Sequence, residues 1–121
     1  CVFDCAPDPF QALEDIIGLG CERILTSGQQ PTAPEGAELI NELVRQADDR
    51  IIIMPGSGVR ADNILELAKA TDASEFHTSA RTKVPSQMSF INTAMKEDQW
   101  VVRADKQEIE KILEILLTLS L

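Results

Sequence analysis

Aromatic and basic side chains are scarce in this chain, and their scarcity excludes whole classes of function. Tyr is absent, Trp and His occur once each, and 20 Asp and Glu against 11 Lys and Arg give 121 residues a net charge of −9. Binding of a phosphate backbone requires clustered cations, and base stacking requires aromatic platforms. We therefore expect no nucleic-acid partner.

Long hydrophobic runs are missing as well. No apolar stretch approaches the roughly 20 residues that span a bilayer, and no basic segment leads into an apolar one as in a secretory signal. The three cysteines lack C-x-x-C spacing, which favours reduced thiols over a disulfide framework. We therefore expect a cytoplasmic protein without a membrane partner, folded as one domain over residues 1–121.

Three apolar runs each close on small polar residues. Residues 22–28 end in Thr-Ser-Gly, residues 51–59 contain Gly-Ser-Gly, and residues 75–81 contain His-Thr-Ser. A shorter run, residues 1–4, ends in Asp4. Because each run leads toward a helical pattern, the chain predicts repeated strand–loop–helix units of a parallel α/β architecture.

Four segments carry the apolar spacing of helices that bury one face. Capping boxes are predicted at Asp8 with Gln11, at Thr32 with Glu35, and at Asp105 with Glu108. The residues expected to face the core are Leu13, Ile16, Ile17, Leu39, Ile40, Leu43, Val44, Ile64, Leu67, Ala68, Ile109, Ile112, Leu113 and Leu116. Residues 81–103, unusually long for a βα loop, are expected to form a lid, a short extra helix or a flexible insertion.

Four βα units amount to half of a (β/α)8 TIM barrel, which takes about 250 residues. A small open doubly wound sheet is the alternative. The half-barrel is favoured because every βα loop carries ligand-type residues and because the first run begins at residue 1.

The loops indicate an anion site at the carboxyl ends of the strands. Glycines between an apolar strand and a helix let backbone N–H groups approach a phosphate, and the helix N-terminus adds partial positive charge. A tight turn is the plainer interpretation of the same glycines. Arg60 and Lys83 could add charge. The residues expected to bind the ligand are Thr26, Ser27, Gly28, Gly56, Ser57, Gly58, Ser79 and Arg81.

Asp4 and His77 are the candidate catalytic residues. A strand-end histidine suits acid–base chemistry or metal binding, and barrel enzymes place carboxylates where Asp4 stands. Both side chains could equally serve as local hydrogen-bond partners. Cys5, Cys21 and Met54 are soft donors that suit Cu(I), but their spacing matches no metal motif, so no metal ligand is assigned.

These motifs resemble a known family. Phe3-Asp4, Asp8-Pro9, the 23–28 and 51–59 segments, Glu75-Phe76-His77 and Ser79-Ala80-Arg81 occur in the order seen in the C-terminal half of the copper homeostasis protein CutC family. The resemblance implies an eight-stranded TIM barrel, with these strands as the fifth to eighth. It also implies copper as the ligand, bound or trafficked in the cytoplasm.

The resemblance leaves three functions open. The family continues upstream for about half a barrel, where its copper-linked cysteines lie, and Cys1 stands where the family usually has Arg. The alternative to copper handling is an enzyme or binder of a phosphorylated small molecule at the strand-end loops, and the third is a fragment that serves only assembly. Exposed sheet edges predict a homo-oligomer, such as a dimer, or pairing with an N-terminal half-barrel.

Overall fold

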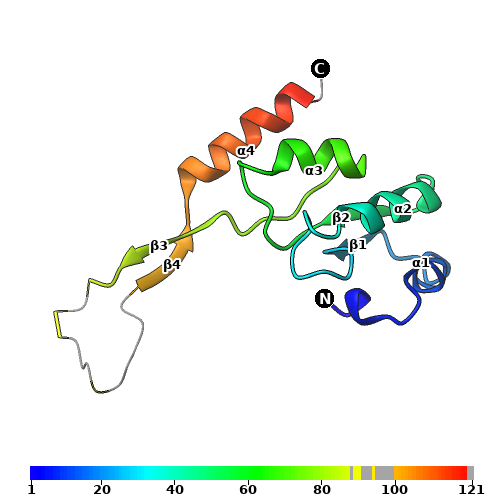
Figure 1. Ribbon diagram of the computed structural model, residues 1–121, viewed down its shortest axis with the longest axis horizontal. Helices are drawn as coiled ribbons and strands as arrows, with labels where there is room; N and C mark the ends of the chain where they lie inside the picture. Colours follow the sequence, from blue (N-terminus) through cyan, green and yellow to red (C-terminus); the bar gives the residue numbers. More distant parts are fainter. Residues whose placement is uncertain (88, 91–93, 95–99, 120–121) are drawn as a thin grey trace.

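The fold is α/β, with a helix-covered body and a two-stranded ribbon that extends away from it (Figure 1). The computed structural model describes residues 1–87, 89–90, 94 and 100–119. In chain order the elements are η1 (Phe3–Cys5), α1 (Pro9–Gly18), β1 (Arg23–Thr26), α2 (Ala37–Ala47), β2 (Ile52–Pro55), α3 (Ile64–Thr71), β3 (Arg81–Pro85), β4 (Trp100–Ala104) and α4 (Lys106–Leu119).

A parallel strand pair lies at the centre of the body. β1 and β2 pair in register from Arg23 opposite Ile52 to Thr26 opposite Pro55. Side chains alternate across a strand, so Ile24 and Ile53 are buried against the helices while Leu25 is 36% exposed on the other face. Leu13, Ile40, Leu43, Ile64 and Ile112 complete the core. The predicted parallel α/β architecture is confirmed for these two strands.

The first helix begins where the sequence predicts. The Asp8 carboxylate accepts the backbone N–H groups of Phe10 and Gln11, each at 3.1 Å, and Pro9 takes the first helical position. The Gln11 side chain, however, donates to Asp15 one turn on, at 3.0 Å, and leaves the expected capping box incomplete.

The other two capping boxes are wrong in different ways. Thr32 Oγ1 donates to Glu35 Oε1 at 2.8 Å, but the pair lies in a turn, and α2 begins later with Gly36 as its N-cap. Before α4, Asp105 does accept the N–H of Gln107 at 2.9 Å, whereas Glu108 turns toward the loop after β2.

Two predicted strands are corrected. Residues 3–5 form the 3₁₀ turn η1, because Asp4 N and Cys5 N donate to Cys1 O and Val2 O within the same segment. Residues 75–78 run beside β2, where His77 N donates to Pro55 O at 2.9 Å, without forming a ladder. Among the described residues, the parallel sheet therefore has two strands rather than four.

The long segment after residue 80 forms an antiparallel ribbon, which the sequence analysis did not predict. β3 and β4 pair from Arg81 opposite Ala104 to Pro85 opposite Trp100. Residues 88, 91–93 and 95–99 of the expected lid, extra helix or insertion lie outside the described residues. Both strands are rich in exposed side chains, with Trp100 and Val102 each 52% exposed.

The C-terminal helix buries only part of its predicted apolar face. Ile112 is 5% exposed and Leu116 packs against the core, whereas Ile109 and Leu113 are 40% and 53% exposed. Those two are corrections to the predicted core. No helix in the described part of the chain has the length and apolar character needed to cross a membrane.

Gly36 provides a test of how tightly the loop after β1 packs. A Cβ at Gly36 would lie 2.7 Å from the Cα of Gly28. We expect Gly36→Ala to lower the free energy of unfolding by about 1–3 kcal/mol, as overpacking does. Gly18→Ala is the control, because a Cβ there meets nothing within 4 Å; it should leave stability unchanged or raise it by about 0.5–1 kcal/mol. Urea denaturation measures both, and equal effects would contradict the close packing.

Candidate functional site

The Asp4 carboxylate organises the loop that follows β1. Its Oδ1 accepts from Thr26 Oγ1 at 2.5 Å and from the backbone N–H of Gln29 at 3.1 Å, and its Oδ2 accepts from the backbone N–H of Ser27 at 3.2 Å. Burial alone would raise the pKa of Asp4, but these hydrogen bonds outweigh it and lower the pKa below its usual value. The structure thus places Asp4 at the loop face; its catalytic role stays a prediction.

The polar groups of Thr26, Ser27 and Gly28 are engaged within the same loop. Thr26 Oγ1 accepts from Gly28 N at 2.9 Å while donating to Asp4, and Ser27 Oγ donates to Gln30 O at 2.6 Å. Thr26 and Ser27 are only 1% and 8% exposed. These residues therefore build the loop, and their predicted contact with a ligand is untested.

The Gly-Ser-Gly loop after β2 is held against the loop after β1. Ser57 Oγ donates to Pro31 O at 2.9 Å, and Ser57 O accepts from Ala33 N at 2.9 Å. Gly58 has a φ of +73°, which glycine adopts without cost. Gly56 is buried, and a Cβ there would meet Leu25 and His77. The two loops thus form one hydrogen-bonded edge at the carboxyl ends of β1 and β2.

A cavity of about 320 Å³ opens between the Gly-Ser-Gly loop and residues 77–81. Five predicted site residues meet in it, together with three that complete its wall. Its lining consists of Ser57, Gly58, Val59, Arg60, His77, Thr78, Ser79 and Arg81. Two guanidinium groups, a histidine and a glycine loop before a helix are a donor set for a small anion. Gly56 and the Thr26–Gly28 loop lie outside this lining.

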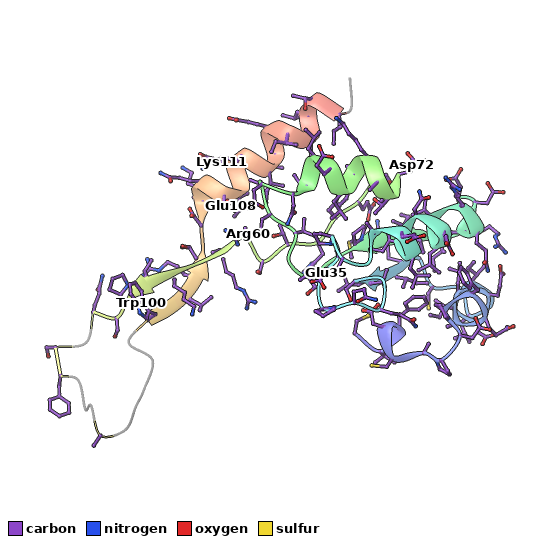
Figure 2. The ribbon with its side chains drawn as sticks, in the orientation of Figure 1. Glu35, Arg60, Asp72, Trp100, Glu108 and Lys111 are labelled. Carbon is purple, nitrogen blue, oxygen red and sulfur yellow. The ribbon has the colours of Figure 1, made fainter. Side chains whose placement is uncertain are left out.

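Arg60 is held in place by a residue that the sequence analysis assigned only to a helix cap. Glu108 Oε1 of α4 lies 3.6 Å from Arg60 Nε and accepts the N–H of Ala61 at 2.7 Å (Figure 2). Arg60 Nη1 also donates to Arg81 O at 3.0 Å. No sequence signal reveals this contact, because Glu108 and Ala61 are 47 positions apart. Lys83 lies on the ribbon and does not line the cavity.

The soft donors do not converge in the described part of the chain. Cys1, Cys5 and Cys21 are all exposed thiols, and Cys1 Sγ donates to Leu25 O. Among the residues that the structure describes, no group of three or more His, Cys, Asp or Glu side chains could hold a metal ion. Within that described part, the thiols and His77 are therefore not gathered into one cluster.

Comparison with known proteins identifies the family. The family model for the CutC family matches residues 1–82, which is well over half of the chain. The chain belongs to the CutC family. A CutC family protein of Parabacteroides distasonis is 51% identical over 108 residues, covering 89% of this chain and 44% of that protein. One of Xanthomonas campestris is 45% identical over 119 residues, covering 95% of this chain and 48% of that protein.

A solved CutC structure shares the fold. The Streptococcus agalactiae protein, named for copper homeostasis, aligns with a TM-score of 0.58 at 33% identity over 62% of this chain and 38% of its own. The chain thus spans less than half the length of these CutC relatives. The Xanthomonas match extends beyond the family model, because its 95% coverage leaves few residues of this chain unmatched.

The lowered pKa of Asp4 predicts a pH-dependent contribution to stability. Because the folded-state pKa lies below the unfolded value of 3.8, the stabilisation is fully present above about pH 4 and is lost as the pH falls through the folded-state pKa. We expect Asp4→Asn to cost about 1–2 kcal/mol at pH 7, since charged hydrogen bonds are lost, and less at pH 3. Urea denaturation at both pH values measures this, and an equal cost at each would contradict it.

Proposed function

We propose that the protein containing this chain binds or traffics copper in the cytoplasm. The match to the CutC family over residues 1–82 carries this proposal, and the name of the S. agalactiae protein supports it. On this proposal, residues 1–121 are one domain of a TIM barrel, in which β1 and β2 correspond to the sixth and seventh strands. The parallel pairing of β1 and β2, with helices covering one face, is consistent with that arrangement.

This chain offers few side chains that could ligate copper. Thiolates dominate Cu(I) affinity, and of the three cysteines only Cys1 and Cys5 lie in one segment, before η1 and at its last residue. Cys21 lies before β1, at the end opposite the loop face. A copper function therefore draws its main ligands from residues outside the described part.

The copper proposal predicts weak Cu(I) binding by residues 1–121 and tight binding by the full-length protein. A competition titration against a chromophoric Cu(I) chelator measures both. Cys1→Ser with Cys5→Ser should remove the residual binding of the chain, and Cys21→Ser should not. Tight one-to-one binding by the chain that survives the double substitution would contradict the ligand assignment. Absence of tight binding at full length would contradict the copper proposal itself.

The cavity supports a second candidate function, binding or conversion of a small phosphorylated molecule. Arg60 and Arg81 line it together with Ser57 and Gly58 of the glycine loop, and guanidinium groups and backbone N–H groups are common phosphate donors. Loops after the last two strands of TIM barrels often hold phosphate. His77 lines the same cavity and could transfer a proton to or from the bound molecule.

Substitutions at Gly58 test whether the cavity binds a phosphate group. Phosphate should stabilise the wild type by about 1–3 kcal/mol at concentrations of 10 to 100 times its Kd, measured as a rise in Tm. Gly58→Asp should abolish the rise, because it adds a negative charge to the loop. Gly58→Asn is the matched control: it has nearly the same size and faces the same positive φ, but carries no charge. Equal stabilisation of the wild type and Gly58→Asp would place any anion elsewhere.

A further inference from the structure

Arg60 lines two neighbouring cavities. One is the cavity beside the Gly-Ser-Gly loop, and the other, of about 510 Å³, lies between residues 60–62 and α4. Glu108 and Lys111 of α4 belong to the lining of the second cavity and not to that of the first. An anion in the first cavity therefore meets Arg60 without touching Glu108.

The backbone around Arg60 is fixed by nearby loop residues. Asn63 Oδ1 accepts from Arg60 N at 2.9 Å, and Asn63 Nδ2 donates to Gly58 O at 2.8 Å. From the opposite wall of the cavity, Thr78 Oγ1 donates to Val59 O at 2.6 Å. These contacts hold the main chain of the loop, but none of them reaches the Arg60 guanidinium.

The Arg60 side chain is held by residues from later in the chain. Its Nε lies 3.6 Å from Glu108 Oε1, and its Nη1 donates to Arg81 O at 3.0 Å. The Glu108 side chain is 13% exposed and that of Arg60 39%, and water screens a partly buried pair less than a fully exposed one. Neither contact uses Nη2, so its two N–H groups remain available to an anion.

The two contacts of the Glu108 carboxylate depend on its charge to different degrees. Oε1 accepts the Ala61 N–H at 2.7 Å, and a neutral amide oxygen can accept the same hydrogen bond. The 3.6 Å separation from Arg60 Nε is too long for a hydrogen bond, so this contact is an ion pair and requires the negative charge. Glu108→Gln therefore removes the contact with Arg60 and spares the contact with Ala61.

We propose that Glu108 is a positioning residue for anion binding, which orders the Arg60 side chain before the anion arrives. This inference rests on the anion-binding function proposed above for the cavity. An arginine that is already ordered loses less conformational freedom when it binds a ligand. The cavity lining lies entirely within residues 1–82, which the family model matches, whereas Glu108 lies beyond them. The α4 segment thus completes a site in the matched part of the chain.

Positioning and simple electrostatics predict opposite effects of Glu108→Gln. Loss of a nearby negative charge by itself strengthens anion binding. Loss of the ion pair frees the Arg60 side chain, and reordering a side chain with many rotamers weakens binding by about three- to tenfold. We expect the second effect to exceed the first, because Glu108 does not line the anion cavity and a more distant charge interacts more weakly with the anion.

Titration of the full-length protein with inorganic phosphate tests the sign of the effect. Isothermal titration calorimetry should give a Kd about three- to tenfold higher for Glu108→Gln than for the wild type. Glu110→Gln is the matched control, because it removes the same charge from the same helix, whereas Glu110 pairs with Lys106 and lines neither cavity. The control should leave the Kd unchanged. In an Arg60→Gln background, Glu108→Gln should have no further effect, because the side chain through which it acts is gone.

The Nε–H group of Arg60 gives a second readout that requires no phosphate. Its resonance in ¹H–¹⁵N NMR spectra is assigned by its loss in Arg60→Gln. We expect its exchange with water to be faster in Glu108→Gln than in the wild type or Glu110→Gln, since the ion pair no longer restrains the group.

The outcomes separate the positioning role from anion binding itself. If Glu108→Gln binds phosphate as tightly as the wild type or more tightly, or if Nε–H exchange is unchanged, the positioning role is overturned and phosphate binding stands. A further loss of affinity in the Arg60→Gln background also overturns it, because the effect then does not pass through Arg60. A wild type that binds no phosphate at millimolar concentration overturns the anion function and the positioning role with it.

Discussion

The hydrogen bonds accepted by Asp4 are the constraint on which the loop face depends. They fix the backbone at Ser27 and Gln29, and so set the course of the loop after β1. That loop then reaches the Gly-Ser-Gly loop through Pro31 O and Ala33 N, which both contact Ser57. The position of the cavity wall at Ser57 and Gly58 therefore depends on a carboxylate in η1, more than fifty positions earlier in the chain.

Glu108, near the other end of the chain, holds the loop after β2 in place. Its carboxylate is 13% exposed and joins the first turn of α4 to Ala61 and Arg60. The ion pair with Glu108 orients the Arg60 guanidinium. Because Arg60 also donates a hydrogen bond to Arg81 O, it connects the two arginines that line the cavity. The first residue of β3, Arg81, is thereby hydrogen-bonded to the cavity wall at Arg60.

Local patterns in the sequence predict the body of the fold, and non-local contacts account for most of the errors. The cap at Asp8 and the buried stripes through Leu13 and Ile40 depend on neighbours within one or two turns, so they are readable from sequence. The same capping pattern at Thr32 and Glu35 closes a turn, because Gly36 passes close to Gly28 and delays the helix. A short apolar run does not show whether a neighbouring strand is present, so residues 1–4 and 75–78 are misassigned as strands.

For the candidate site too, local patterns were predictable from the sequence and non-local contacts were not. The sequence predicts that the segment with His77, Ser79 and Arg81 lies beside the loop with Ser57 and Gly58. The structure brings them together in one cavity because residues 75–78 run beside β2, although they form no strand. Glu108 was missed because its partner is chosen by tertiary packing.

The chemistry of the described residues and the family name point to different ligands. Guanidinium groups and backbone N–H donors attract hard anions, whereas Cu(I) prefers thiolates. The cavity contains the first set, and the three thiols lie outside its lining. A copper role for the whole protein and an anion role for this cavity therefore use separate residues. Substitutions at Gly58 or Arg81 should leave copper binding unchanged, and substitutions at Cys1 or Cys5 should leave phosphate binding unchanged. Paired phosphate and Cu(I) titrations of the same variants measure this independence, and a variant that loses both ligands together while remaining folded would contradict it.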